Sequence, residues 1–298
     1  MEYRTLRRAG LQVSELSFGC MSLAGNDAEN ARLLHKAFDQ GVNYFDTADL
    51  YQNGANEDTV GKALQDRRGD VIIATKVGNE IRPDGSGWDW NPSKKYILKA
   101  VDKSLQRLRT DYIDLYQLHG GTIDDPIDEV IEAFSELKAA GKIRHYGISS
   151  IRPNVIREYL DRAHILSNMM QYSLLDRRPE EEAMHLLHEK GVGLMVRGAL
   201  AKGILAGKGA MSYLNYPVQV VDLLLNKLNA FSIEKMPLSK VALQWVLANP
   251  VVSTVVLGIR TEAQLDDALA YYDSPFLNEA QLLDLSSILK PNIYANHR

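Results

Sequence analysis

Three consecutive stretches of the chain decide its fold: VIIATK at residues 71–76, SKKYILKAVDKSLQRL at residues 93–108 and YIDLYQLH at residues 112–119. The first and third are short apolar runs without regular polar alternation, which is typical of parallel strands covered on both faces. The middle stretch follows Pro92 and repeats apolar residues at helical spacing between Ile97 and Leu108. The pattern predicts a strand, a helix and a second strand parallel to the first.

The same alternation continues along the chain. Candidate strands lie at Glu15–Phe18, Val42–Phe45, Val71–Thr75, Tyr112–Leu118, Ile143–Ile148, Ile165–Met170, Gly193–Val196 and Ser253–Leu257. Candidate helices, with recognisable start and stop signals, lie at Asp27–Gln40, Ser93–Leu108, Asp128–Ala140, Pro179–Lys190, Pro237–Ala248 and Thr261–Ala270. Such repetition leaves two architectures, an open doubly wound sheet or a closed (β/α)8 barrel.

The number of candidate strands favours the barrel. Eight of them are spread over 298 residues, whereas length alone would suggest two domains of roughly 150 residues. None is followed by the G-x-G-x-x-G turn that a dinucleotide-binding doubly wound domain usually carries. We therefore expect a single α/β domain, a (β/α)8 TIM barrel, over residues 1–298.

Segments outside the repeat complete this expectation. Tyr3–Leu6 and Gln12–Ser14 predict an N-terminal β-hairpin that closes the bottom of the barrel. The connections Gly78–Asn91 and Gly198–Lys235 are unusually long, and long loops after barrel strands are where substrate is usually handled. The acidic run Glu180–Glu182 suits the start of a helix, where it complements the helix dipole.

Composition limits the classes of function. The chain is 45% hydrophobic and 24% charged with a formal net charge of −4, so no basic field recruits nucleic acid or a membrane. Cys20 is the only cysteine, which excludes an intrachain disulfide and a thiolate metal cluster, and no histidine motif beside it indicates a catalytic thiol. No apolar run approaches the roughly 18 residues of a transmembrane helix, and no secretory signal begins the chain. We expect a cytoplasmic protein, monomeric by default, that acts on a small molecule.

Polar side chains stand where most of the candidate strands end, which is the edge of a barrel that carries chemistry. The residues directly after the strands are Gly19, Asp46, Lys76, His119, Ser149, Gln171, Arg197 and Gly258. A helix cap or a rim role explains any one of them. The set is harder to explain structurally, because an acid, an ammonium and an imidazole would share one rim.

Tyr51 lies in the loop that follows Asp46, close enough to fold back over the rim. A phenol, with a pKa near about 10, is a poor acid at neutral pH without help. A neighbouring ammonium such as Lys76 favours the phenolate, and a carboxylate paired with that ammonium keeps it charged and in place. With an imidazole to orient a carbonyl, the constellation predicts proton donation to a carbonyl oxygen.

At this point the chain resembles the aldo-keto reductase family. The resemblance rests on FDTADLY at residues 45–51, ATK at 74–76 and DLYQLH at 114–119, together with LRRAGLQVS at 6–14, GVN at 41–43 and GKIRHYGIS at 141–149. It implies an NAD(P)H-dependent carbonyl reductase on a (β/α)8 barrel, without a metal. The family's catalytic tetrad falls on Asp46, Tyr51, Lys76 and His119. Tyr51 would be the general acid, Lys76 paired with Asp46 would assist it, and His119 would position the carbonyl oxygen.

The resemblance also implies a binding site for NADP(H). Its carboxamide would meet Ser149, Ser150 and Gln171, although the family often has Asn where Ser150 stands, and Arg197 replaces an aromatic residue that stacks on the nicotinamide. The complete set of expected cofactor residues is Gly19, Ser149, Ser150, Gln171, Arg197, Gly198, Leu200, Lys202, Gly203, Gly258, Arg260, Gln264 and Asp267. Arg260, at the start of a helix, is placed to meet a 2′-phosphate, which argues for NADP over NAD. Ala268 stands where the family often has an adenine-binding Asn.

Trp88 and Trp90 lie in the polar, glycine-containing connection after Lys76. Two indoles in such a loop seldom belong to a core, so we expect them to shape the mouth of a pocket for apolar or aromatic carbonyl substrates.

Other interpretations remain open. Lys76 could form a Schiff base in a barrel lyase or aldolase, although the motif of Asp46 and Tyr51 argues against it. A non-enzymatic cofactor sensor is the second alternative, because some members of the resembling family are channel-associated subunits. Two further patterns are discounted. Gly203–Lys208 is one residue short of a P-loop, which argues against a nucleotide triphosphatase. Glu182, His185 and His188 are interpreted as an exposed helix face rather than a metal site.

Overall fold

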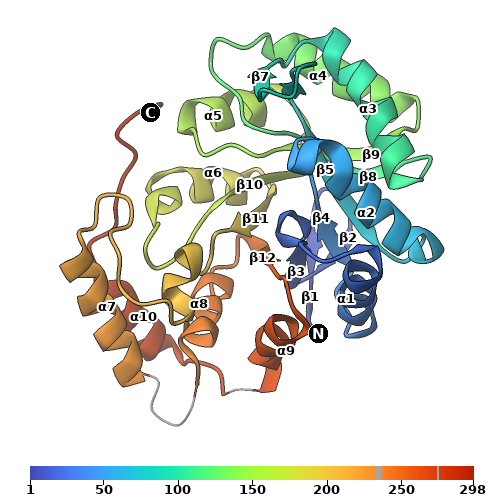
Figure 1. The fold of residues 1–298 in the computed structure, drawn as a ribbon. Coiled ribbons are helices and arrows are strands. Elements are labelled where there is room, and N and C mark those ends of the chain that lie inside the picture. Colours follow the sequence, from blue (N-terminus) through green and yellow to red (C-terminus); the bar gives the residue numbers. More distant parts are fainter. Residues whose placement is uncertain (232–235, 274) are drawn as a thin grey trace.

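The computed structural model describes residues 1–231, 236–273 and 275–298, and at its centre lies a closed barrel of eight parallel strands (Figure 1). The strands in chain order are β3 (Leu16–Gly19), β4 (Tyr44–Asp46), β5 (Ile72–Val77), β8 (Ile113–Leu118), β9 (Ile143–Ile148), β10 (Ser167–Gln171), β11 (Gly193–Arg197) and β12 (Val252–Gly258). Each pairs with the strands before and after it, and β12 pairs with β3 to close the ring. The predicted (β/α)8 architecture is confirmed.

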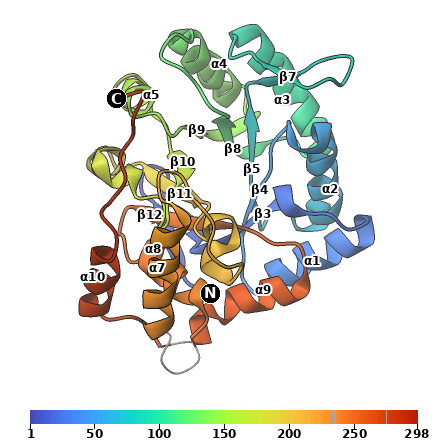
Figure 2. The ribbon, with the colours of Figure 1, turned by 60° about the vertical axis from the view of Figure 1, so that its left-hand side comes forward.

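Helices surround the barrel on its outer face (Figures 1 and 2). They are α1 (Asp27–Asp39), α2 (Ala55–Leu64), α3 (Lys94–Leu108), α4 (Ile127–Ala139), α5 (Pro153–Arg162), α6 (Ala183–Glu189), α7 (Val218–Phe231), α8 (Leu238–Leu247), α9 (Glu262–Leu269) and α10 (Glu279–Ser287). Both views place α7, α8 and α10 together on one side. None of the described helices is long and apolar enough to cross a bilayer.

The interior of the barrel is a small apolar cluster closed from below by the N-terminal hairpin. Strands β1 (Tyr3–Leu6) and β2 (Leu11–Ser14) pair antiparallel, and they contribute Leu6 and Val13 to this cluster. The barrel strands contribute the rest of it: Tyr44, Ile72, Ala74, Leu115, Leu166, Met169, Met195 and Val256. The predicted hairpin at the bottom is therefore confirmed.

Alternation along the strands determines what lies above this apolar cluster. Successive side chains of a strand point to opposite faces, so residues two positions beyond an interior residue also face inward. Six inward positions at the upper end follow from the interior cluster in this way: Asp46, Lys76, Gln117, Gln171, Arg197 and Gly258. A polar layer thus covers an apolar one.

Strand ends differ from the sequence prediction. Six residues that were expected just after strands lie within them: Gly19, Asp46, Lys76, Gln171, Arg197 and Gly258. In the barrel, Lys76 pairs with Gln117 and Gln171 with Arg197. Strands pair through backbone hydrogen bonds, so a strand can continue through a polar residue when the side chain of that residue points into the top of the barrel.

The two long connections contain regular structure that was not predicted. Within Gly78–Asn91, strands β6 (Asn79–Ile81) and β7 (Trp88–Trp90) form an antiparallel hairpin. The connection Gly198–Lys235 contains the 3-10 segment η5 (Ala201–Ala206) and helix α7 (Val218–Phe231), while its residues 232–235 lie outside the described part of the chain.

The predicted helix Pro179–Lys190 is instead two elements. A 3-10 turn, η4 (Arg178–Glu181), precedes α6, and the backbone of Glu182 between them is not helical. Each acid of the run Glu180–Glu182 pairs with a separate cation, Arg177, Arg298 and Arg157 respectively. These ion pairs, rather than one helix dipole, account for the acidic run.

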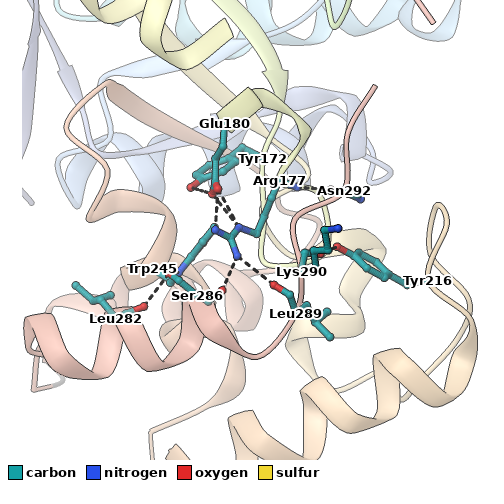
Figure 3. A network of polar contacts seen from close by, with 10 residues as sticks. All are labelled: Tyr172, Arg177, Glu180, Tyr216, Trp245, Leu282, Ser286, Leu289, Lys290 and Asn292. Carbon is teal, nitrogen blue, oxygen red and sulfur yellow. Dashed lines mark hydrogen bonds and ion pairs between the residues drawn. The ribbon is translucent and has the colours of Figure 1, made fainter. Parts of the chain in front are cut away.

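A polar network fastens the C-terminal segment to the loop after β10 (Figure 3). The Arg177 guanidinium pairs with Glu180 at 2.7 Å and donates to the backbone carbonyl of Ser286 at 2.6 Å. Tyr172 donates to the same Glu180 carboxylate at 2.8 Å, and the Trp245 indole donates to the Ser286 hydroxyl at 2.8 Å. Arg177 thereby links β10, α8 and α10.

Replacing Arg177 with Ala is therefore expected to destabilise the fold by about 2–4 kcal/mol, because it leaves Glu180 and a helix-end carbonyl without their charged donor. Urea unfolding followed by circular dichroism measures the change. Arg162→Ala is the matched control: its pairs with Asp128 and Glu158 are at the surface, so we expect a loss below about 1 kcal/mol. Equal losses in the two variants would contradict the structural importance of this network.

Candidate active site

A buried ion pair joins β4 to β5 at the top of the barrel. The Lys76 ammonium lies 2.5 Å from Oδ1 of Asp46 and donates to the backbone carbonyl of Thr47 at 2.7 Å. Lys76 and Asp46 are only 1% and 4% exposed. The third group that Lys76 reaches is the Tyr51 hydroxyl, at 3.4 Å. The ammonium therefore stands between a carboxylate and a phenol.

His119 completes this cluster from the next strand. It directly follows β8, and its imidazole lies edge-on to the Tyr51 ring with the two ring centroids 5.8 Å apart. The backbone N–H of His119 donates to the carbonyl of Val77 at 2.7 Å, which holds the residue beside β5. The four residues of the predicted tetrad thus come together at one end of the barrel, from three neighbouring strands and one loop.

Tyr51 reaches the site because its loop folds back across β5. The backbone N–H groups of Thr47 and Asp49 donate to the carbonyls of Ala74 at 2.8 Å and of Lys76 at 3.3 Å. The chain then turns through left-handed conformations, with φ of 51° at Gln52 and 55° at Asn53, before α2 begins. The position of Tyr51 is a consequence of these backbone contacts.

Two buried residues at the start of α2 support the loop and the neighbouring strand β5, and the sequence analysis did not identify them. Asn56 accepts from the Thr47 hydroxyl at 2.7 Å and donates to the carbonyl of Cys20 at 2.8 Å. Glu57 accepts from the Thr75 hydroxyl at 2.5 Å and from Arg107 at 2.6 Å. A signal was available only in the proximity of Asn56-Glu57 to the FDTADLY motif, because their partners are far away in the chain.

Burial and charge set the protonation of the cluster. Burial opposes the charge of Lys76, but Asp46 and Tyr51 outweigh it, so the pKa of Lys76 lies above its ordinary value and the ammonium stays charged. Burial and the cations Lys76 and Arg197 lower the pKa of His119 to about 3, so its imidazole is neutral at physiological pH. Behind the loop, burial and the charge of Glu57 raise the pKa of Asp49 to about 8.

The expected carboxamide-binding residues line the next three strands. Ser149 follows β9, and Gln171 and Arg197 end β10 and β11 in direct register. Ser150 is held by Asn168, a residue that the sequence analysis missed: their backbone and amide groups exchange two hydrogen bonds at 3.1 Å. Within the described residues, the side chains of Ser149, Gln171 and Arg197 make no hydrogen bond, so their donors and acceptors can meet a polar ligand.

The loop after β11, which carries several of the expected cofactor residues, makes a tight turn. Lys202 and Gly203 have positive φ, 58° and 92°, and Leu200 accepts from the backbone N–H of Gly203 at 2.8 Å, which makes a tight turn after Gly198. Side chains rarely adopt the φ of Gly203, so its backbone conformation favours glycine.

Arg260 stands exposed just before α9. Its backbone N–H donates to the Gln264 side chain at 2.9 Å, and Thr261 caps the helix. Neither Arg260 nor Lys202 belongs to an ion pair among the described residues, so both can meet an anion. Asp267, also in the expected set, lies 3.4 Å from the Ser239 hydroxyl.

Two glycines of that set are close to neighbouring atoms. A Cβ at Gly19 would lie 3.1 Å from the Leu257 carbonyl, and one at Gly258 would lie 2.5 Å from the Ser22 hydroxyl.

Together, the free polar side chains of β9 to β11 and the unpaired cations Lys202 and Arg260 fit a ligand that carries an amide at one end and phosphates at the other.

The two tryptophans of β7 differ in their surroundings. Trp90 packs over Gly78 and Gly120, where a Cβ at Gly78 would come within 2.6 Å of the indole, and its Nε1 donates to Asp125 at 2.9 Å. The indole of Trp90 is therefore held in one orientation next to the loop that follows His119. Trp88 is 48% exposed.

Comparisons with known proteins agree with the barrel fold and identify the family. The model of the aldo/keto reductase family matches residues 15–290. The uncharacterized oxidoreductase YqkF of Bacillus subtilis (strain 168) is 46% identical and is matched over 100% of both chains. The solved holo form of the aldo-keto reductase AKR11C1 from Bacillus halodurans is 50% identical, with a TM-score of 0.95 over 100% of this chain and 99% of that chain. A probable voltage-gated potassium channel subunit beta of Oryza sativa subsp. japonica is 32% identical over 92% of each chain.

The low pKa of His119 predicts a pH dependence of stability. Between an ordinary pKa of about 6.5 in the unfolded chain and about 3 in the folded one, the unfolded chain binds the extra proton, so the free energy of unfolding falls as pH falls through this window. His119→Gln should remove this contribution. Measuring unfolding of both proteins from pH 4 to 8 tests it, and NMR should show no titration of His119 near pH 6.5. A His119 signal that does titrate there would contradict the effect of burial and the two cations.

Proposed function

Because this chain belongs to the aldo/keto reductase family, which carries out NAD(P)-dependent oxidoreduction of carbonyl compounds, we propose that it reduces an aldehyde or ketone to the alcohol with NADPH. One observation supports the proposal above the others: the Lys76 ammonium contacts both Asp46 and the Tyr51 hydroxyl, in a buried position at the carboxyl end of the barrel.

Tyr51 is the proposed general acid. Its hydroxyl is the group of the cluster that can point a proton at a substrate carbonyl, and the Lys76 ammonium stabilises the phenolate that remains after the proton is transferred. Asp46 keeps Lys76 charged and in place. His119, neutral and edge-on to the Tyr51 ring, is the proposed donor or acceptor that orients the carbonyl oxygen.

The cofactor, when bound, supplies the hydride. The proposed contacts are Ser149, Ser150 and Gln171 at its amide end, Arg197 at the nicotinamide ring, and Lys202 and Arg260 at its phosphates. Support comes from the free hydrogen-bonding groups and unpaired cations at these positions. A single domain that works as a monomer in the cytoplasm completes the proposal, and size-exclusion chromatography with light scattering tests the oligomeric state.

The proposed substrate is an apolar or aromatic carbonyl compound. Trp90 supports this choice, because its indole is fixed by Asp125 and lies over Gly120, next to His119. Trp88 is exposed enough to contact a bulky substituent at the outer edge of the same hairpin.

A Schiff-base mechanism through Lys76 is disfavoured. Such a nucleophile must be a neutral amine, usually reached by lowering the pKa of a lysine in an apolar pocket. Here the pKa of Lys76 is raised by Asp46 and Tyr51, against the effect of burial.

A regulatory role is a second candidate, favoured by the similarity to the probable potassium channel subunit beta of Oryza sativa subsp. japonica. An NADPH-oxidation assay with a panel of aldehydes and ketones, run beside a pull-down for a protein partner, separates the two. Turnover of any carbonyl supports the enzyme, and a specific partner without turnover supports the regulatory role.

Tyr51→Phe should reduce carbonyl reduction by about 10²–10⁴-fold, because it removes the proton donor and little else. NADPH binding, measured by fluorescence titration, should remain near that of the unaltered chain. Tyr3→Phe is the matched control, since Tyr3 lies on the hairpin at the opposite end of the barrel, where its hydroxyl donates to the Gly41 carbonyl. Near-normal turnover in Tyr51→Phe would overturn the assignment of the general acid.

Arg260→Ala should weaken NADPH far more than NADH. Loss of a charge-assisted contact to the 2′-phosphate costs roughly 1–3 kcal/mol, which is about 5- to 150-fold in the dissociation constant. Titration with both cofactors measures the ratio, and Arg162→Ala on α5 is the control. An equal effect on NADPH and NADH would show that Arg260 does not bind the phosphate.

A further inference from the structure

Buried polar atoms without partners among the described residues lie in the layer of the proposed tetrad. Gln117 is fully buried, and within the described residues neither its Nε2 nor its Oε1 has a hydrogen-bond partner. Oδ2 of Asp46, the oxygen that does not face Lys76, is buried and unpartnered as well. An unsatisfied buried polar group costs about 1–3 kcal/mol, whereas a leucine or methionine at position 117 would have no such cost. The amide therefore needs an explanation other than packing.

The barrel places this amide in the same layer as the ion pair. Gln117 on β8 pairs in register with Lys76 on β5, and Asp46 ends β4 on the other side of β5. All three residues face inward, two positions above the apolar residues Leu115, Ala74 and Tyr44. A free donor, Nε2 of Gln117, and a free acceptor, Oδ2 of Asp46, thus belong to neighbouring side chains of one enclosed layer.

Gln117 also influences the Asp46 carboxyl. Burial raises the pKa of Asp46, while Lys76, Arg197 and the Gln117 amide lower it. The amide is close enough to act on the carboxyl, but the two side chains do not meet hydrogen-bond geometry in this conformation, so one of them must move to make the bond.

We propose that Gln117 is a positioning residue for carbonyl reduction: its amide donates to Oδ2 of Asp46 and thereby fixes the carboxylate that holds Lys76 against Tyr51. The inference rests on the proposed function of Asp46, Lys76 and Tyr51. It assigns to Gln117 no contact with substrate or cofactor.

The geometry explains why such positioning matters. Lys76 lies 2.5 Å from Asp46 but 3.4 Å from the Tyr51 hydroxyl, so the contact with the phenol is the longer one. A carboxylate held by one oxygen can rotate, and rotation carries the ammonium with it. A donor on the second oxygen prevents this rotation and stabilises the ionised form of the acid.

Other groups near Asp46 also influence its carboxyl, and the experiment must separate their effects from that of Gln117. They are Lys76 on β5, Arg197 on β11, the Tyr44 hydroxyl on its own strand and the Cys20 thiol on η1 (Cys20–Ser22). Lys76 and Arg197 carry charge, so replacing either one would change the field of the whole site. Gln117 is neutral, so replacing it with the neutral methionine changes the local contact and adds no charge.

The test uses Gln117→Met, which keeps the length of the side chain, and Gln117→Glu, which keeps its shape. The readout is the pH profile of single-turnover NADPH oxidation with 4-nitrobenzaldehyde, together with the NADPH dissociation constant and the melting temperature. Activity needs ionised Asp46, so it is lost as pH falls through the pKa of that group, and raising this pKa moves the acid limb to higher pH.

With Gln117→Met we expect the acid limb to move up by about one pH unit and the rate at pH 7 to fall about tenfold. Gln117→Glu should move it further, because a second carboxyl then faces Asp46. NADPH binding should stay within about twofold. Tyr159→Phe, which removes another buried and unpartnered hydroxyl on α5, is the control and should leave the profile unchanged.

An acid limb that stays in place in both folded variants, or that moves equally in Tyr159→Phe, would overturn the role of Gln117. The variant Lys76→Met distinguishes this result from failure of the proposed function. If Lys76→Met is inactive while the Gln117 variants match the unaltered chain, only the positioning role is wrong. If Lys76→Met is active, the proposed tetrad itself is wrong.

Discussion

The buried pair of Asp46 and Lys76 is the constraint on which the upper end of this barrel depends. Taking two charges out of water costs several kcal/mol per ion, and a single close contact does not by itself offset that cost. Lys76 therefore needs all of its partners: the Asp46 carboxylate, the Thr47 carbonyl and the Tyr51 hydroxyl. The contact that completes the hydrogen bonds of the Lys76 ammonium also positions the Tyr51 phenol. The loop that carries Tyr51 therefore helps to stabilise the buried ion pair.

The closed barrel stabilises this buried ion pair, because it holds all the partners of Lys76 in place, which an isolated loop could not do. The inner face below is apolar, from Leu6 and Val13 of the hairpin up to Ala74 and Leu115, so water is excluded from beneath the pair. The alternation of the strands then brings the next inward side chains to one level. Outside the strands, Glu57 at the start of α2 joins Thr75 of β5 to Arg107 of α3, and this fixes the strand that carries Lys76 from its outer side.

Much of this could be predicted from the sequence, for identifiable reasons. Apolar runs such as residues 143–148 form strands almost where expected, because burial on both faces leaves little ambiguity, and β9 begins and ends as predicted. The proposed tetrad could be named from the sequence because its members lie at strand ends or in one short motif. What the sequence did not reveal depends on distant contacts. Asn168 matters through Ser150, and Trp90, which the sequence did single out, is held by contacts with two glycines and Asp125 that the sequence does not show.

Gln117 is a clearer case, because its position in a strand hides its chemistry: within YIDLYQLH it looks like one polar residue in an apolar run, and only the register with Lys76 reveals its neighbours.

The charge of Lys76 bears on which residue of the proposed site gives up the proton. The site holds two candidate donors, the Tyr51 phenol and a protonated His119 imidazole. Burial and the cations Lys76 and Arg197 lower the pKa of His119 to about 3. At neutral pH the imidazole is therefore neutral and holds no acidic proton that a mechanism through the imidazolium would need. The same Lys76 stabilises the phenolate of Tyr51. One cation thus disfavours the histidine as an acid and favours the tyrosine, which supports the division of roles in which His119 orients the carbonyl and Tyr51 protonates it.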